Sequence, residues 1–226
     1  MTLEVFPNLE QGSDEWLAAR CGLLTASVIG KLITPKLQLA DNETSRGVIE
    51  TLVAERITGH VEYVHPSFDM QRGSMDEPYA RDLYAKEYAP VTEIGFAVRT
   101  ISGYQLGASP DGLIADDSGL EIKSRSPKIQ LRTILTNEIP TANLAQIHAC
   151  MFVLDRDRWE YCSYAGGWPL HVIGVHRDPR WDAVIIDTLN AFEDTAALMI
   201  SAYQRAVAGS PVAPLIDHYA EIEIQL

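Results

Sequence analysis

Cysteine, long apolar runs and basic residues are all scarce in this 226-residue sequence. Its three cysteines, Cys21, Cys150 and Cys162, lie far apart and form no CxxC pair. They exclude a four-cysteine iron–sulfur cluster and argue against a zinc site or a disulfide scaffold, which indicates a reduced cytoplasm. No apolar run approaches the ~20 residues that a membrane span needs. The N-terminus also lacks the basic start and apolar stretch of a secretory signal. We therefore expect a cytoplasmic protein with no membrane partner.

The shortage of basic residues bears directly on possible partners. Lysine and arginine total 18 against 31 acidic residues, which gives a formal net charge of −13 and a pI of about 4.8. Taken alone, this balance disfavours nucleic acid, because phosphate binding favours a basic surface. One interpretation is therefore a non-catalytic acidic protein that binds a nucleic-acid enzyme. The segment 123–132 is an exception, because it is basic and contains no acid. A net charge does not exclude a local basic groove.

The size and composition favour one folded domain. Hydrophobic residues make up 46% of the chain and charged residues 22%, which is enough apolar material for a sizeable core. The sequence shows no internal repeat, low-complexity tract or obvious linker, so we expect a single domain over residues 1–226. Helices alternate with strand-like segments, which predicts an α/β fold with a central mixed β-sheet flanked by helices.

Hydrophobic periodicity and turn residues place the individual elements. Residues 14–33 are expected to form two short helical pieces broken near Gly22. The helix over residues 73–88 is expected to begin at Ser74 as its N-cap, with Pro78 in its first turn. The alternating segment 220–226 fits either a strand at a subunit contact or an edge strand. Other helices are expected over residues 43–57, 141–154 and 181–207, and strands over residues 93–100, 104–115, 120–124, 158–165 and 170–177.

The segment "GASPDGLIADDSGLEIKSRSP", residues 107–127, is polar for a hairpin in the middle of a fold. A three-residue loop, Asp117-Ser118-Gly119, would place Gly119 in the left-handed position of a bulged turn. An odd loop pairs residues of equal parity, so Asp111, Glu121 and Lys123 would project from the same face. A two-residue loop would put Asp111 on the opposite face.

Two carboxylates and an ammonium on one face suit phosphodiester chemistry. Hard divalent cations such as Mg²⁺ take oxygen ligands, and they activate water and neutralise charge on the phosphate. A PD followed by (D/E)xK is the signature of restriction-endonuclease-like nucleases, and "SPDG…GLEIKS" fulfils it. The same residues also fit an ordinary surface hairpin with a cross-strand Glu–Lys pair, because the bare pattern is short.

Four segments of the chain carry a shared pattern: "DEWLAARCGLLTAS", "RGSMDE", "SPDGLIADDSGLEIKS" and "AQIHACMF". The first contains a tryptophan, an arginine, a glycine and a TAS tripeptide. Together the segments resemble the lambda exonuclease group of phage recombination nucleases, the YqaJ-like viral recombinases. The second segment is similar to the G-x-x-x-E helix start of that family, the third to its catalytic hairpin and the fourth to its glutamine helix. Their order and spacing agree from about residue 10 to about residue 180.

The resemblance implies a restriction-endonuclease-like PD-(D/E)xK core with a magnesium site, where two ions bind and Mn²⁺ substitutes. Asp111, Glu121 and the backbone carbonyl of Ile122 would ligate the metal, and Glu77 would complete the acidic set. Lys123 would position the attacking water. Glu77 also follows Ser74 by three residues in a capping-box spacing, so it could simply close a helix end.

The resemblance also implies a site for a terminal 5′-phosphate, formed by Arg20, Thr25, Ser27 and Gln146. Arginine suits this role because its planar fork donates twice to phosphate oxygens. The same residues could instead be a helix-surface arginine, two cap hydroxyls and a buried amide. The wider RecB-type pattern has tyrosine four residues after the glutamine, where this chain has Cys150.

The activity that the resemblance implies is a Mg²⁺-dependent 5′→3′ exonuclease on double-stranded DNA ends. It would release 5′-mononucleotides and leave 3′ single-stranded overhangs for recombination by annealing. The expected partners are two further copies of the chain in a ring-shaped homotrimer and a single-strand annealing recombinase. Met70 would be a wedge between bases, although a lone methionine commonly fills a core. An endonuclease or structure-selective nuclease on the same core is the alternative.

Overall fold

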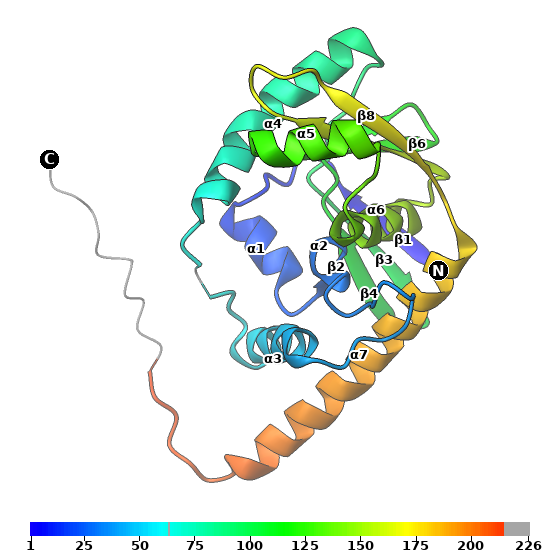
Figure 1. The fold of residues 1–226 in the computed structure, drawn as a ribbon. Helices are drawn as coiled ribbons and strands as arrows, with labels where there is room; N and C mark the ends of the chain where they lie inside the picture. The colour runs from blue at the N-terminus through cyan, green and yellow to red at the C-terminus, as the bar shows by residue number, and fades with distance from the viewer. Residues whose placement is uncertain (63, 215–226) are drawn as a thin grey trace, which may run out of the picture.

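Residues 1–62 and 64–214 are described in a computed structural model of the chain (Figure 1). The expected segment 220–226 lies outside the described residues. Within this part of the chain, no helix is both long enough and apolar enough to span a bilayer. The helices are α1 (Asp14–Arg20), α2 (Ala26–Ile29), α3 (Glu43–Thr58), α4 (Phe68–Glu87), α5 (Pro127–Thr136), α6 (Thr141–Leu154) and α7 (Pro179–Ala206).

The strands confirm the α/β class and divide into two mixed sheets flanked by helices. One sheet has the order β1-β3-β4-β2 and the other β5-β6-β7-β8. In the second sheet, β6 pairs parallel with β7, while β5–β6 and β7–β8 pair antiparallel. The strands are β1 (Thr2–Phe6), β2 (Leu24–Thr25), β3 (Phe96–Ile101), β4 (Tyr104–Ala108), β5 (Gly112–Ile114), β6 (Ser118–Ser124), β7 (Arg158–Tyr164) and β8 (His171–His176).

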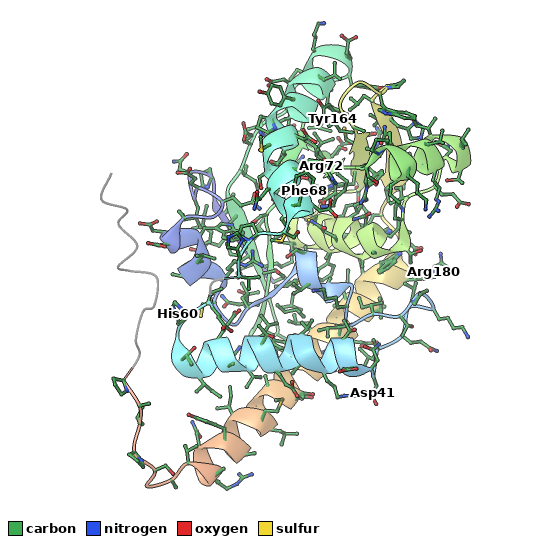
Figure 2. All side chains as sticks on the ribbon, turned by 60° about the vertical axis from the view of Figure 1, so that its left-hand side comes forward. Asp41, His60, Phe68, Arg72, Tyr164 and Arg180 are labelled. Atoms are coloured by element: carbon green, nitrogen blue, oxygen red, sulfur yellow. The ribbon has the colours of Figure 1, made fainter. Side chains whose placement is uncertain are left out.

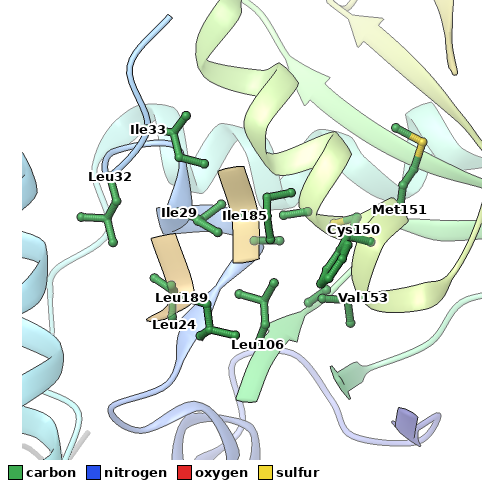
Figure 3. Packing of buried hydrophobic residues seen from close by; sticks show 14 of the residues in the cluster. Leu24, Ile29, Leu32, Ile33, Leu106, Cys150, Met151, Val153, Ile185 and Leu189 are labelled. Carbon is green, nitrogen blue, oxygen red and sulfur yellow. The ribbon is translucent and has the colours of Figure 1, made fainter. Parts of the chain in front are cut away.

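The main core lies where α6 and α7 pack with the first sheet. Nearly all of the second half of α6 is buried, which is typical of a helix that is apolar on every side. Figure 3 shows Cys150 and Met151 of α6 close to Ile185 of α7 and Leu106 of β4. Because α6 is enclosed in this way, any polar side chain on it has a closely fixed position.

Helix α4 begins seven residues earlier than expected. Ser67 is its N-cap, and the hydroxyl of Ser67 accepts from the amide of Met70 at 3.3 Å. Ser74 lies inside the helix and donates its hydroxyl to the carbonyl of Met70 at 3.3 Å. Pro78 is therefore in the helix interior, where it removes one backbone hydrogen bond. The correction excludes a capping box at Ser74, so Glu77 does not close a helix end.

The expected break near Gly22 is confirmed. The backbone there has φ +65°, and a Cβ at this position would lie 2.3 Å from Cγ of Arg56. Glycine is required both for the left-handed conformation and for the close approach of α3. The chain then enters the short strand β2 and helix α2, which the sequence did not separate. This break brings the "TAS" segment next to α6.

Candidate active site

The β5–β6 hairpin is the centre of the site. Its strands pair Gly112 with Leu120 and Ile114 with Ser118, so the loop is residues 115–117. The loop has three residues as expected but lies two positions earlier than expected. Gly119 is consequently in β6 with an extended backbone, and the prediction of a left-handed Gly119 is wrong. A Cβ on Gly119 would lie 2.3 Å from the ring of Trp159, so close packing explains this glycine.

The loop still has an odd length, so the expected alignment of side chains is preserved. Continuing the pairing by one step beyond Gly112–Leu120 places Asp111 opposite Glu121. The amide of Ile122 donates to Oδ2 of Asp111 at 2.6 Å, which fixes the aspartate against β6. Asp111, Glu121 and Lys123 are therefore brought together on one face of the hairpin.

Glu121 is fully buried, which is unusual for a carboxylate. Its Oε1 forms an ion pair with Nζ of Lys123. Neither carboxylate oxygen accepts a hydrogen bond of ordinary geometry from the residues that the structure describes. Burying a carboxylate with so few hydrogen bonds destabilises the fold, and this cost indicates that the group binds a ligand or takes part in catalysis.

Glu77 extends toward the hairpin from α4 and is held by an arginine. Arg81 lies one turn further along the helix and forms an ion pair with Glu77. Its Nε donates to the backbone carbonyl of Asp111 at 2.8 Å, and its Nη1 lies 2.9 Å from Oε2 of Glu93. Arg81 thus links α4 to the hairpin. Arg81 was not identified from the sequence: its i,i+4 spacing indicates only the ion pair with Glu77, and its contact with the Asp111 carbonyl joins distant segments.

Burial dominates the acidity of this cluster. It raises the pKa of Glu121 to about 7, with Asp111 adding to the shift and Lys123 opposing it. Burial likewise raises the pKa of Glu77 to about 7, again with a contribution from Asp111. The pKa of Asp111 is also raised by burial, against the opposing effects of Lys123 and the Ile122 amide. The carboxyl groups therefore hold protons more tightly than usual when no cation is bound.

Lys123 carries the positive charge of the cluster. Burial alone would lower its pKa, but the carboxylates of Glu121 and Asp111 outweigh burial and raise it. The ammonium therefore stays charged across the physiological range. Its side chain is also partly exposed, so it can approach a substrate from the open side of the hairpin.

The donor set fits a hard divalent cation. Glu77, Asp111 and Glu121 supply carboxylate oxygens, which Mg²⁺ and Mn²⁺ prefer. In the part of the chain that the structure describes, no three His, Cys, Asp or Glu side chains are gathered closely enough to hold a metal ion. Glu77 instead pairs with Arg81, and Glu121 with Lys123. The fit therefore rests on the chemistry of the donors and on the buried, unsatisfied oxygens of Glu121.

A second network joins α4 to β6 just beyond Lys123. The hydroxyl of Ser124 donates to Oδ2 of Asp76 at 2.6 Å, and Nε of Arg72 donates to the same hydroxyl at 3.0 Å. Figure 2 shows Arg72 near Tyr164, which is the β7 partner of Ser124. Sequence analysis did not identify these contacts, because they join residues about fifty positions apart.

Arg20 lies at the end of α1 with its guanidinium 4.2 Å from the centre of the Trp16 ring. Burial lowers the pKa of Arg20, and Glu55 opposes that shift. The indole Nε1 of Trp16 donates to Oγ of Ser109 at 3.0 Å. Trp16 is buried, and it connects Arg20 with the loop that precedes Asp111.

The two hydroxyls of the "TAS" segment lie side by side, with Oγ1 of Thr25 at 3.1 Å from Oγ of Ser27. Helix α2 packs closely on α6, since a Cβ on Gly30 would lie 3.0 Å from Cβ of Ala145. Gln146 is the next residue on α6 and is partly exposed. Within the described residues, no hydrogen bond links Arg20 to these three side chains or binds the amide of Gln146. The structure therefore brings Thr25, Ser27 and Gln146 onto the packed elements β2, α2 and α6, whereas Arg20 is placed only by its contact with Trp16.

Cys150 connects this region with the acidic cluster. It is fully buried, and burial raises its pKa well above the ordinary value, with further contributions from Glu121 and Asp111. Helix α6 therefore passes close to the hairpin carboxylates. Gln146 lies one turn before Cys150 on the same face of α6. Met70 lies on the first turn of α4 and is 56% exposed, so it does not fill the core.

The fold and this hairpin define a nuclease of the PD-(D/E)xK type. The model of the YqaJ-like viral recombinase domain family matches residues 15–157, more than half of the chain. The chain therefore belongs to the YqaJ-like viral recombinase family. This confirms the resemblance read from the four sequence segments.

Solved structures show the same relationship. An alkaline exonuclease, LHK-Exo, from Laribacter hongkongensis is 30% identical with a TM-score of 0.77, and the match covers 87% of this chain and 98% of that one. The same enzyme in complex with dAMP matches equally well. At 30% identity this chain is a relative of LHK-Exo rather than the same protein. These matches support a phage-type exonuclease.

A more distant structure shares the fold alone. A phage-related exonuclease from Haemophilus somnus 129PT is 12% identical with a TM-score of 0.61, and the match covers 80% of this chain and 96% of that one. No curated protein matches the chain.

Proposed function

We propose that the chain is a Mg²⁺-dependent 5′→3′ exonuclease that acts on the ends of double-stranded DNA. It releases 5′-mononucleotides and leaves 3′ single-stranded overhangs for recombination by annealing. The observation that carries the proposal is the buried cluster of Asp111, Glu121 and Lys123, in which Glu121 pairs with Lys123 but accepts no hydrogen bond of ordinary geometry from the described residues. Residues 1–226 form one nuclease domain in this proposal.

Asp111, Glu121 and Glu77 would hold the metal, with the backbone carbonyl of Ile122 as a further ligand. A bound divalent cation supplies Lewis acidity, which lowers the pKa of water and neutralises charge on the phosphate. The pair of ions expected from the family would share these carboxylates, and Mn²⁺ would substitute for Mg²⁺. The raised pKa values of Glu77 and Glu121 then have a simple consequence. The carboxyl groups must release their protons when they bind the cation.

Lys123 is the residue that we assign to the attacking water. Its charged ammonium lies beside Glu121 and near Asp111, where it would donate a hydrogen bond to the water or to the phosphate oxygens as negative charge develops. Arg81 contributes indirectly by holding Glu77 and the backbone of Asp111 in place. Lys123 does not act as a base in this proposal, because its raised pKa keeps the ammonium protonated.

The direction of digestion follows from the proposed phosphate pocket. Arg20 on α1, Thr25 of β2, Ser27 on α2 and Gln146 on α6 would together bind a terminal 5′-phosphate, with the hydroxyls of Thr25 and Ser27 turning from each other to the phosphate oxygens. The Trp16–Ser109 hydrogen bond ties this pocket to the loop before Asp111. An enzyme that anchors a 5′-phosphate beside its metal site cleaves the first phosphodiester bond from that end. Met70, which is exposed at the start of α4, would be the wedge that separates the terminal bases.

The assembly and partner complete the proposal. Three copies of the chain would form a ring around the DNA, which allows processive digestion despite a net charge of −13. A single-strand annealing recombinase would bind the strand that the enzyme leaves. Both statements rest on the family, and the activity proposal does not depend on either.

The decisive experiment is digestion of linear, nicked and circular duplexes with and without Mg²⁺. Strands labelled at the 5′ or the 3′ end reveal the direction, and chromatography identifies the products. We expect linear duplex alone to be degraded, with 5′-mononucleotides released from the 5′ end only when Mg²⁺ is present. Cleavage of closed circles would favour an endonuclease on the same core. No digestion under any condition would favour the non-catalytic acidic binding protein.

A further inference from the structure

The loop of the catalytic hairpin is held from outside by one arginine. Arg156 lies in the turn between α6 and β7, and its Nη1 donates to the carbonyls of Ala115 at 2.9 Å and Ile114 at 3.3 Å. The same nitrogen also donates to the carbonyl of Ser118. These carbonyls belong to the last residue of β5, the first residue of the loop and the first residue of β6, so a single guanidinium group joins the two strands of the hairpin.

The backbone of the same turn adds two more contacts. The carbonyl of Asp117 accepts from the amides of Asp157 at 3.2 Å and Arg158 at 3.1 Å. The loop carbonyls are therefore satisfied mainly by the 156–158 turn. Burial lowers the pKa of Arg156, and the carboxylates of Asp116 and Asp117 partly offset that shift. The negative charge of the loop is complementary to the positive charge of Arg156.

The loop sequence does not stabilise this conformation by itself. Ala115 has φ +46°, in the left-handed region that costs an ordinary residue about 1–2 kcal/mol. Three-residue hairpin loops usually place glycine at the left-handed position. The loop residues 115–117 are Ala-Asp-Asp and contain none. An external support is therefore needed to keep Ala115 in this conformation.

The register of the hairpin decides whether the metal ligands meet. Asp111 faces Glu121 only because the loop has an odd length and Ile114 pairs with Ser118. A slip of one residue would turn Asp111 to the opposite face of the sheet. The Ile122 amide, which donates to Oδ2 of Asp111 at 2.6 Å, would then lose its acceptor.

We infer that Arg156 is a positioning residue that fixes the register of the β5–β6 hairpin and so holds Asp111 opposite Glu121. This inference rests on the proposed function, because it gives the alignment a role in binding the metal. Arg156 itself contacts no proposed ligand. It acts through the loop carbonyls and through the left-handed conformation of Ala115.

The first test needs neither metal nor substrate. Hydrogen exchange of the Ile122 amide is measured in the metal-free protein for wild type, Arg156→Ala and the control Arg56→Ala. Arg56 also donates to a backbone carbonyl, that of Gly22, but it belongs to a different part of the fold. We expect exchange at Ile122 to be faster by about tenfold or more in Arg156→Ala and unchanged in Arg56→Ala.

The second test measures Mn²⁺ binding by calorimetry on the same proteins. We expect Arg156→Ala to weaken Mn²⁺ binding by about 10–100-fold, as is usual for residues that orient metal ligands. Adding Ala115→Gly to Arg156→Ala should recover about fivefold, because glycine adopts the left-handed conformation without support. Ala115→Gly alone should leave Mn²⁺ affinity close to that of wild type.

Two results would overturn the inference. One is wild-type exchange at Ile122 together with wild-type Mn²⁺ affinity in Arg156→Ala. The other is a loss that Ala115→Gly fails to reduce, because Arg156 would then act only through general stability. If Arg156→Ala does not fold, Arg156→Lys replaces it, since lysine keeps the charge but cannot span three carbonyls. A wild type without Mn²⁺ binding or nuclease activity would refute the proposed function, and the exchange comparison would still decide the positioning role.

Discussion

Replacing Glu121 with glutamine should stabilise the metal-free protein while abolishing its nuclease activity. Glu121 is fully buried, and its carboxylate lacks hydrogen bonds of ordinary geometry within the described part of the chain. Glutamine has nearly the same shape and carries no charge. The substitution therefore removes the cost of burying a carboxylate and, at the same time, removes a metal ligand.

The size of the effect follows from the pKa of Glu121. Its rise from 4.5 to about 7 means that ionisation in the folded protein costs about 3 kcal/mol more than in the unfolded chain. This shift already contains the attraction of Lys123. The glutamine amide adds donor groups that face the ammonium of Lys123, so we expect a net gain of about 1–3 kcal/mol. For a chain of this length, the gain raises Tm by about 2–4 °C per kcal/mol.

The pH dependence has a definite sign. A carboxyl group with a raised pKa binds its proton more tightly in the folded state, so it lowers stability as pH rises from about 4.5 to about 7. Wild type and Glu121→Gln should therefore have similar Tm values near pH 4, where Glu121 is neutral in both states. The difference should grow with pH and level off near pH 8. Asp111 and Glu77 remain in both proteins, so the difference between them reports the Glu121 charge together with its effect on these neighbours.

The assay is thermal unfolding followed by circular dichroism in EDTA at a series of pH values. Glu138→Gln is the control, because Glu138 lies exposed in the loop between α5 and α6. It should show no pH-dependent gain. Adding Mn²⁺ should raise the Tm of wild type more than that of Glu121→Gln, because binding to the folded state stabilises it. A wild type that is the more stable protein at pH 8 in EDTA, or a difference that does not change with pH, would refute this reasoning.

Three further predictions concern activity. Lys123→Ala should reduce kcat by about 10²–10³-fold, with the fold retained by circular dichroism. The control Lys86→Ala, which changes an exposed lysine, should leave kcat unchanged. Substantial activity in Lys123→Ala would show that Lys123 does not position the attacking water. Arg20→Ala should digest 5′-phosphorylated ends about 10–100-fold more slowly and lose the preference over 5′-hydroxyl ends, since a charged contact contributes about 1.5–3 kcal/mol. A mutant that keeps the full preference would show that Arg20 is not the anchor. Trp16→Phe keeps a ring beneath Arg20 but loses the donor to Ser109, so initial rates should fall about two- to tenfold with the 5′-phosphate preference intact. Unchanged rates would show that this hydrogen bond does not position the loop before Asp111.

The features that could be predicted from the sequence depend on local patterns. The helix over residues 141–154 matches α6, because its apolar content is continuous and its ends are well marked. The shared face of Asp111 and Glu121 follows from strand alternation, which depends only on whether the loop is odd or even. That explains why the alignment was correct although the loop was placed two residues too late.

The features that could not be predicted depend on contacts between distant segments. Ser67 and Ser74 are equally suitable caps in the sequence, and packing of α4 on β6 accompanies the earlier start. The turn "DDSG" indicated a left-handed Gly119, but Trp159 occupies the space above that glycine. The left-handed residue is Ala115 instead, held by Arg156 from forty positions away. Arg81 was missed for the same reason, because its target is a backbone carbonyl on another element.

In this site, the residues proposed to bind the metal are different from the residues that hold those ligands in position. Glu77, Asp111 and Glu121 repel one another, and burial increases the cost of their charges. Their positions therefore cannot arise from mutual attraction. They depend on donors attached to the surrounding framework, which are Arg81 on α4, the Ile122 amide on β6 and Arg156 after α6. A site of this kind loses stability when it is empty and regains it on binding a cation, which couples metal binding to the order of the hairpin.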